Sequence, residues 1–239
     1  MRSLPGDLSG SSEEVKQFFD QWEIYRKVVE YNYLHHREAY AAIGESLRGV
    51  KGAFSVVDLG AGDASWTGPA LAPCEVASYE AVDLSAVALA LAEHNLRDLS
   101  CEKIFTQSDY FPYVQNRSEA CDVIFVGLSL HHLKEPDKRV FFSHARRLLP
   151  EEGRLIFYEP IREPEESREE VLARWWKEAK NWSGLTSEEL AKVQDHVFGY
   201  DYPEPLELFR GMASEAGFRD SRVRYVDEKR LYAVVECEA

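Results

Sequence analysis

Cysteine is scarce in this sequence, and the few cysteines present stand far apart. They are Cys74, Cys101, Cys121 and Cys237, and no two of them form a Cys-x-x-Cys pair. This spacing argues against a structural zinc site and against a disulfide framework, because both use cysteines at short, paired intervals. We therefore expect reduced thiols and a cytoplasmic protein.

Long apolar runs are also missing. No stretch reaches the roughly 18 consecutive apolar residues that a membrane-spanning helix needs. The first ten residues, which include Pro5, Gly6 and Gly10, lack the apolar core of a signal peptide. The sequence therefore predicts a protein with no secretory leader and no membrane partner.

Positive charge is in the minority. The chain has 28 Lys and Arg residues against 42 Asp and Glu residues, which gives a formal net charge of −14. Nucleic-acid-binding proteins gain much of their affinity from basic patches, and no Lys/Arg cluster with interleaved aromatics occurs here. We therefore do not expect DNA or RNA as a partner.

What the chain does have is an alternation of short apolar segments with helical patterns. Apolar residues make up 45% of its 239 residues, enough for the core of one large domain. The expected strands are 54–59, 76–82, 103–107, 121–127 and 154–158, with helices at 85–96 and 137–149. A helix over 206–217, ended by Gly217, then precedes an antiparallel hairpin of strands 222–226 and 231–237. This order predicts an α/β fold: a doubly wound, mostly parallel seven-stranded sheet with helices on both faces and an antiparallel C-terminal hairpin.

Two helical segments stand outside this rhythm. The N-terminal pattern, with a capping box of Ser11 and Glu14, continues to about residue 48 and has a break near Asn32. After the fifth strand, residues 164–203 are rich in charge and tryptophan, which indicates a helical cap inserted into the fold. The chain thus divides into an N-terminal helical segment, residues 1–48, and one domain, residues 49–239.

The turn after the first strand carries the first chemical signal. It reads Asp58-Leu59-Gly60-Ala61-Gly62, leaves a strand and enters a helix. Glycine has no Cβ, so the backbone of such a turn can approach a ligand closely. The turn alone also fits the start of a dinucleotide site, whose third small residue would be Ser65.

Acidic residues follow the next two strands. Asp83 stands 23 positions after Gly60, where a carboxylate can accept hydrogen bonds from a ribose diol. Helix capping is the other role open to Asp83, but Ser85 is better placed for it. Asp109 follows the third strand and can accept from an adenine amino group, with Tyr110 beside the ring, although by itself it also fits an ordinary acidic turn. Together with Asp58, these acids place three carboxylates at the carboxyl ends of strands, where open α/β sheets bind ligands.

A pair of histidines follows the fourth strand. The segment from Cys121 to Leu133 is a strand that runs into a loop reading Leu130-His131-His132-Leu133. Taken together, these motifs resemble class I S-adenosylmethionine-dependent methyltransferases of the small-molecule type. The resemblance covers about residues 50–160 and includes the turn over residues 148–155. The sequence departs from the family pattern at Ala64 and Glu152. A dinucleotide enzyme is a poorer match, because Ser65 fits only partly and nothing resembles a hydride-transfer site.

The resemblance implies S-adenosylmethionine as the cofactor and methyl transfer to an N, O or S atom of a small-molecule acceptor. It also implies that the N-terminal segment folds over the cofactor as a lid. The cofactor-binding residues implied are Asp58, Gly60, Ala61, Gly62, Asp83, Leu84, Asp109, Tyr110 and Leu128, with Tyr33 and His36 from the lid.

Methyl transfer from a sulfonium needs a general base only where the acceptor holds its proton at neutral pH. His131 is the first candidate for that base, and His132 is the second, with a structural role open for either. Glu159, after the fifth strand, is expected to accept from the substrate or to form an ion pair with Arg162.

Substrate selection is expected in the cap, at His196 and Tyr200. No His-x-x-x-His pair occurs, so no metal site is expected. Two alternative functions stay open: a protein-directed methyltransferase, and a non-catalytic cofactor-binding module on the same fold.

Overall fold

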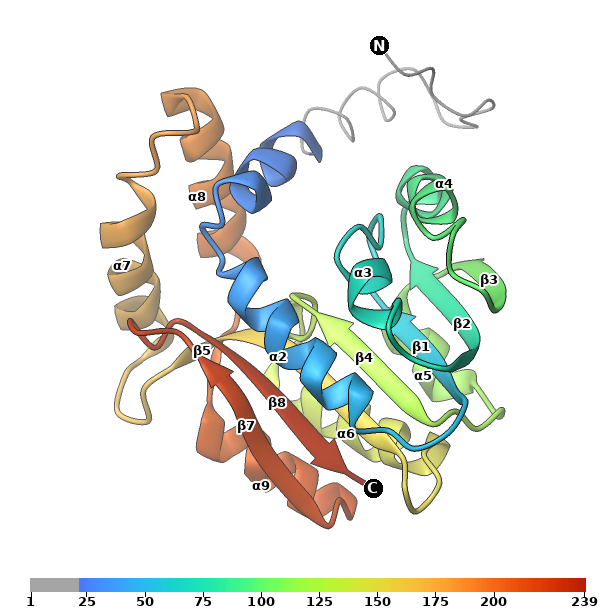
Figure 1. Cartoon of the computed structure of the whole chain (residues 1–239). Helices are drawn as coiled ribbons and strands as arrows, with labels where there is room; N and C mark the ends of the chain where they lie inside the picture. Colours follow the sequence, from blue (N-terminus) through green and yellow to red (C-terminus); the bar gives the residue numbers. More distant parts are fainter. Residues whose placement is uncertain (1–21) are drawn as a thin grey trace.

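The computed structural model of the chain describes residues 22–239 (Figure 1). Its strands run in the spatial order β3-β2-β1-β4-β5-β8-β7, and the two-residue β6 pairs with β5 beside this path. The strands are β1 (Phe54–Leu59), β2 (Val76–Asp83), β3 (Glu102–Gln107), β4 (Val123–Gly127), β5 (Arg154–Arg162), β6 (Glu204–Pro205), β7 (Asp220–Val226) and β8 (Tyr232–Glu238). All pairs are parallel except those of β8 with β5 and with β7. The predicted mostly parallel sheet with a C-terminal antiparallel hairpin is therefore confirmed.

Helices cover both faces of the sheet. These helices are α2 (His36–Arg48), α3 (Thr67–Leu71), α4 (Ala86–Asn95), α5 (Tyr110–Asn116), α6 (Glu135–Leu148) and α9 (Leu206–Ala216), while α7 (Arg168–Ala179) and α8 (Ser187–Tyr200) form the cap. Successive strand residues alternate between two cores: Val56 packs with α2, α3 and α4, whereas Val57 packs with α5, α6 and α9. None of the helices in residues 22–239 is long and apolar enough to cross a membrane.

The sheet topology determines where a ligand can bind. β1 lies between β2 and β4, so the chain runs outward from β1 to β3 and then returns to the other side of β1. In open α/β sheets a crevice forms where the strand order reverses, outside the carboxyl ends of the strands. Here that crevice lies beyond the ends of β1 and β4, which carry the glycine turn and the histidine loop.

The N-terminal segment breaks where the sequence predicts a break. Residues 22–30 are helical, residues 31–34 form a turn, and α2 then begins at His36. Asn32, after the first of these helices, and His35, directly before α2, have left-handed φ values of 58° and 62°. The expected capping box of Ser11 and Glu14 lies outside the described residues.

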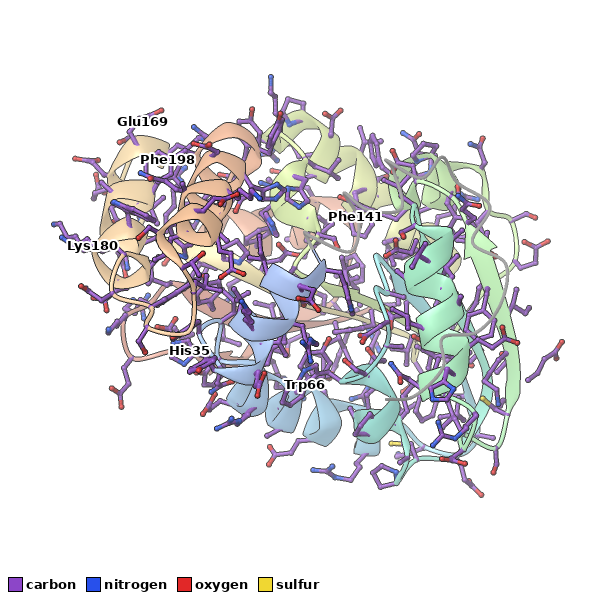
Figure 2. The ribbon with its side chains drawn as sticks, turned by 90° about the horizontal axis from the view of Figure 1, so that it is seen from above. His35, Trp66, Phe141, Glu169, Lys180 and Phe198 are labelled. Atoms are coloured by element: carbon purple, nitrogen blue, oxygen red, sulfur yellow. The ribbon has the colours of Figure 1, made fainter. Side chains whose placement is uncertain are left out.

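The cap is helical as predicted, and its two helices begin with capping boxes. Ser167 and Glu170 satisfy each other's backbone N–H groups at the start of α7, and Thr186 and Glu189 do the same for α8. In Figure 1 the helix of residues 22–30 lies beside α8. Seen from above in Figure 2, this helix lies between the cap and the side of the domain that carries α3 and α4.

Some elements differ from expectation. No bounds were predicted for α3, the helix expected after the glycine turn, and α5 was not predicted at all, because helices of five and seven residues carry too short a periodic pattern. β4 begins at Val123 rather than 121, and β5 continues to Arg162 rather than ending at 158. The extension of β5 places Glu159 inside a strand rather than in a loop after it.

Candidate functional site

The glycine turn after β1 is built by two left-handed residues. Gly60 and Gly62 have φ values of +70° and +55°. The backbone N–H groups of Gly60 and Ala61 donate to the carbonyl of Val82, at 2.8 and 3.1 Å. A Cβ added at Gly60 would lie 2.2 Å from the hydroxyl oxygen of Ser129, whereas one added at Gly62 would meet nothing within 4 Å. The turn is thus packed directly against the loop that follows β4.

This difference predicts unequal effects of two matched substitutions. Gly60→Ala forces a left-handed alanine and a clash with Ser129, so we expect a loss of about 2–4 kcal/mol in the free energy of unfolding. Gly62→Ala carries only the backbone cost, about 1–2 kcal/mol. Chemical denaturation of the two variants measures the difference. Equal losses would show that Ser129 moves aside at no cost.

Asp83 lies beside the glycine turn, at the end of β2. Its Oδ2 accepts from the N–H of Gly62 at 2.9 Å, and its Oδ1 accepts from the N–H of Ser85 at 2.8 Å. A carboxylate has about four acceptor positions, so two stay open for a ligand. Burial raises the pKa of the Asp83 carboxyl. Ser85 caps α4 through its own hydroxyl, as predicted, and the neighbouring Leu84 is 67% exposed, a free apolar surface beside the acid.

Asp58 does not join this polar surface. It is 1% exposed, and its Oδ2 accepts from the Tyr79 hydroxyl at 2.6 Å. Burial raises the pKa of the Asp58 carboxyl to about 7. Asp58 thus joins β1 to β2 beneath the glycine turn, and its expected contact with the cofactor stays a prediction.

Three further predicted residues lie around the same crevice. Asp109 is exposed and caps α5, where its Oδ1 accepts from the N–H of Phe111 at 2.9 Å. The Tyr110 hydroxyl donates to the carbonyl of Ser129 at 2.9 Å. Leu128 has a left-handed φ of 53°, unusual for a branched side chain, and its N–H donates to β5. Tyr110 thus contacts the loop that follows β4, and Leu128 is the first residue of that loop.

The two candidate residues of the N-terminal segment, Tyr33 and His36, make contacts within the protein. The Tyr33 hydroxyl accepts from the N–H of Gly184 at 2.8 Å, and its ring stacks on Trp182 at 4.5 Å. Tyr33 therefore joins the N-terminal segment to the cap, together with the ion pair of Lys27 and Glu189. Its expected contact with the cofactor stays a prediction.

His36 is 1% exposed and lies among aromatic rings. Its Nε2 is 3.1 Å from the Tyr25 hydroxyl, and its ring contacts Tyr40, Trp66 and Tyr158. Its Nδ1 makes no hydrogen bond within residues 22–239. Burial lowers the pKa of His36 to about 4, so the imidazole is neutral at neutral pH. His36 packs the lid against the domain instead of presenting a charge.

Glu159 holds the histidine loop in place. It is fully buried, and its Oε1 accepts from the N–H groups of Ser129 and Leu130, both at 2.8 Å. Its Oε2 accepts from the N–H of His131 at 3.0 Å and lies 2.6 Å from His131 Nδ1. Burial alone lowers the pKa of His131, but the charge and hydrogen bond of Glu159 outweigh it and raise that pKa above its usual value. Because a carboxylate only accepts, Nδ1 carries a proton, and Nε2 is the nitrogen left for other contacts.

This placement corrects both roles expected of Glu159. Its oxygens are occupied within the protein, so Glu159 is a positioning residue for His131 rather than a contact for the substrate. Arg162 pairs instead with Glu204, at 3.4 Å.

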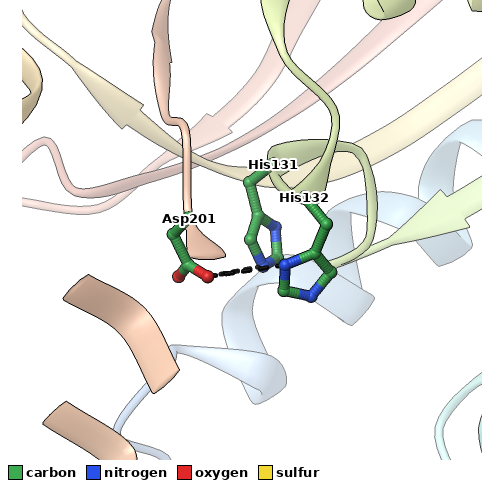
Figure 3. Close-up of side chains that lie close together, drawn as sticks. All are labelled: His131, His132 and Asp201. Carbon is green, nitrogen blue, oxygen red and sulfur yellow. Dashed lines mark ion pairs between the residues drawn. The ribbon is translucent and has the colours of Figure 1, made fainter. Parts of the chain in front are cut away.

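Asp201, which the sequence did not single out, lies opposite His131. It follows α8 in the cap, and its Oδ1 is 3.7 Å from His131 Nε2 and 3.5 Å from His132 Nδ1 (Figure 3). His196 Nε2 lies 3.9 Å from the same oxygen. Burial raises the pKa of the Asp201 carboxyl, while His131 acts to lower it. No local motif marks Asp201, because His131 and His132 stand 70 and 69 positions before it in the sequence.

The cap is tied to the histidine loop through its backbone. The N–H of Tyr202 donates to the carbonyl of His131 at 2.7 Å. The buried Lys138 of α6 donates to the carbonyl of Tyr202 and, at 3.1 Å, to Glu204. These contacts hold Asp201 beside the two histidines.

A cavity of about 750 Å³ opens between the lid, the cap and the carboxyl ends of the strands. His131, His132 and Leu128 line it from the domain, and His196, Tyr200 and Asp201 line it from the cap. Its apolar walls include Tyr25, Val28, Leu34, Val171, Leu172, Trp175, Trp182, Val193 and Tyr232. The predicted site residues that the structure gathers around this cavity are Leu128, His131, His132, His196 and Tyr200. Tyr33, His36 and Glu159 do not line it.

Comparison with known proteins extends this description. Residues 56–153 match a family model described as a methyltransferase domain. No curated protein sequence matches the chain. Among solved structures, it is similar to a possible exported protein from Bordetella parapertussis, with a TM-score of 0.63, 16% identity, and coverage of 84% of this chain and 67% of that one.

Two further structures carry named ligands. Magnesium protoporphyrin IX methyltransferase from Synechocystis PCC 6803, with bound SAH, has a TM-score of 0.62 at 16% identity, covering 92% of this chain and 93% of that chain. An O-methyltransferase family 2 protein from Planctomyces limnophilus, in complex with apigenin, has a TM-score of 0.62 at 15% identity, covering 96% of this chain and 62% of that chain. The chain thus spans about two thirds of the Bordetella and Planctomyces proteins, and identities this low establish the shared fold alone.

Proposed function

The chain carries a methyltransferase domain over residues 56–153 on the class I methyltransferase fold, and from this premise we propose that it methylates a small molecule with S-adenosylmethionine. The observation that carries the proposal is the contact between the glycine turn and the histidine loop. Gly60 lies against Ser129, and the same loop continues into His131 at the wall of the cavity. The cofactor crevice and the acceptor cavity are therefore adjacent.

The residues at the crevice fit the cofactor. Gly60 and Gly62 leave room for close approach of a ligand, and Asp83 retains acceptor positions for a ribose diol. Leu84 and Tyr110 would flank the adenine, with Asp109 as the acid beside it. When bound, S-adenosylmethionine supplies an electrophilic methyl group, while the protein supplies alignment and a dry pocket.

If the cofactor binds in this crevice, removal of the Asp83 carboxylate should weaken its binding measurably. Asp83→Ala should weaken S-adenosylhomocysteine binding by about 1.5–3 kcal/mol for each charge-assisted hydrogen bond lost. Isothermal titration calorimetry measures the affinity. Asp98→Ala, an exposed acid after α4, is the matched control and should bind as tightly as the unmodified protein. Binding of NAD with no response to S-adenosylhomocysteine would refute the cofactor.

The cavity supports a small acceptor with an apolar or aromatic body. Its volume of about 750 Å³ lies in the usual range for small-molecule sites, and most of its walls are apolar. The polar end of the cavity is formed by His131, His132, His196 and Asp201. An acceptor bound there would place its N, O or S atom near His131 Nε2, and Nε2 would take the proton that this atom loses.

The proposed setting is the cytoplasm, with no nucleic-acid partner. All four cysteines are free thiols, which suits a reducing compartment. Turnover of labelled S-adenosylmethionine with a panel of small aromatic hydroxyl, amine and thiol compounds tests the function. Labelling of protein instead of these compounds would favour a protein-directed enzyme, and binding without turnover of either would favour a non-catalytic module.

A further inference from the structure

Three histidine nitrogens surround one carboxylate oxygen at the polar end of the cavity. Asp201 Oδ1 lies 3.7 Å from His131 Nε2, 3.5 Å from His132 Nδ1 and 3.9 Å from His196 Nε2. Asp201 is 8% exposed, and within residues 22–239 its Oδ1 has no hydrogen-bond partner. A buried carboxylate oxygen without a partner is costly, so the arrangement calls for a positive group among these atoms.

We propose that His131, His132 and Asp201 bind a divalent transition-metal ion. One ligand atom from each of the three residues lies within 4.8 Å of the others. Zinc bonds to nitrogen and oxygen are about 2.0–2.2 Å long, so tetrahedral ligand atoms lie about 3.3–3.6 Å apart. The separations of Asp201 Oδ1 from His131 Nε2 and His132 Nδ1, 3.7 and 3.5 Å, are close to that spacing and too long for strong hydrogen bonds.

The surroundings of the ligands are those of a metal site. Glu159 holds His131 Nδ1 at 2.6 Å, which directs Nε2 toward Asp201. Carboxylates that bind the second nitrogen of a histidine in this way orient metal ligands and raise their basicity. Asp201 is anchored by its N–H, which donates to the carbonyl of Val197 at 3.1 Å. His131 and His132 line the cavity from the domain and Asp201 lines it from the cap, so the ion would also join the cap to the domain.

His196 is the candidate fourth ligand. Its side chain is 58% exposed and its ring lies 5.3 Å from that of His132, so it can turn toward the ion without movement of α8. Imidazole and carboxylate ligands together suit zinc, iron, cobalt or nickel, whereas magnesium and calcium take oxygen ligands almost alone. The nitrogen and oxygen ligands of the cluster therefore favour a divalent transition-metal ion such as zinc or iron over magnesium or calcium.

Binding of the ion does not depend on methyl transfer, but its role in catalysis rests on the proposed function. The ion and a proton compete for His131 Nε2. In the metal-loaded protein the acceptor heteroatom would coordinate the ion, which lowers its pKa, and its proton would pass to solvent water. In the metal-free protein His131 would take that proton itself. His131 is thus required in either state.

The test is titration of the full-length protein, first dialysed against a chelator, with Zn²⁺ in the presence of a chromophoric competitor. We expect one Zn²⁺ per chain, and the near-isosteric Asp201→Asn should lower the affinity at least about ten-fold. His132→Ala should do the same, and because the His132 side chain is 38% exposed, this variant decides the matter if Asp201→Asn fails to fold. Magnesium should not compete. His94→Ala, an exposed histidine on α4, is the matched control and should bind Zn²⁺ as the unmodified protein does.

Less than one Zn²⁺ per chain, or equal affinity in His132→Ala, Asp201→Asn and His94→Ala, would overturn the metal site. S-adenosylhomocysteine is titrated into the same samples. Zinc binding without S-adenosylhomocysteine binding would refute the proposed function and leave the metal site intact. Binding of S-adenosylhomocysteine without binding of zinc would refute the metal site and leave the proposed function intact.

Discussion

Replacing His131 by alanine is expected to lower kcat by about 10²–10⁴-fold, the usual loss when a general base is removed. The reason is geometric: Glu159 fixes His131 Nδ1, which leaves Nε2 at the cavity wall as a base or as a metal ligand. Affinity for S-adenosylhomocysteine should change little, because the cofactor contacts we propose are made by Gly60, Gly62 and Asp83 instead. Steady-state kinetics with an acceptor found by labelled-cofactor screening, together with calorimetry, measures both quantities.

The control for this prediction is His94→Ala, which removes an exposed histidine far from the cavity and should keep full activity. Two results would contradict the role of His131. Full activity of His131→Ala would show that the reaction needs no base at His131 and depends on alignment of the acceptor instead. A parallel loss of cofactor affinity would make His131 a structural residue of the loop.

Replacing Glu159 by alanine is expected to reduce the free energy of unfolding by about 3–5 kcal/mol, as for a buried ion pair that loses one partner. The substitution leaves the backbone N–H groups of Ser129, Leu130 and His131 without their acceptor, and each unsatisfied buried donor costs about 1–3 kcal/mol. Domains are typically stable by only about 5–15 kcal/mol, so this loss is a large fraction of the total. Urea denaturation measures it.

A conservative substitution separates the two tasks of Glu159. Glu159→Gln keeps an oxygen for the backbone donors of Ser129 and Leu130, so its loss of stability should be smaller than that of Glu159→Ala. Its amide nitrogen cannot accept from His131 Nδ1, so kcat should still fall. Glu215→Ala, which breaks an exposed ion pair with Arg139, should cost less than about 1 kcal/mol. If Glu159→Ala is no more destabilised than Glu215→Ala, the buried hydrogen bonds contribute nothing to stability.

The main elements of the fold were predictable because each is encoded by a local pattern. β1 and β2 begin where the sequence predicts, and Ser85 caps α4 through its side chain. Gly217 ends α9 in the left-handed conformation. Such signals depend on neighbours within a few positions, so one sequence is enough to detect them.

The side-chain contacts were less predictable because their partners come from distant segments. Tyr33 and Asp58 belong to patterns that suggest ligand contacts. In the structure the Tyr33 ring stacks on Trp182, and the Asp58 carboxylate accepts a hydrogen bond from Tyr79. Glu159 was expected at the substrate because the predicted strand ended before it. The actual strand is longer, which buries Glu159 behind His131.

The sequence by itself determined the order of strands and helices, the glycine turn, the acid after β2 and the histidine pair, since each depends on residues adjacent in the chain. Only the tertiary structure decided that His131 is held by Glu159 and that Asp201 lies opposite it, 3.7 Å away. The cap reaches the histidine loop through backbone bonds such as that from Tyr202 to His131. Contacts of this kind form when the sheet and cap pack together, and periodicity, which describes one element at a time, carries no information about them.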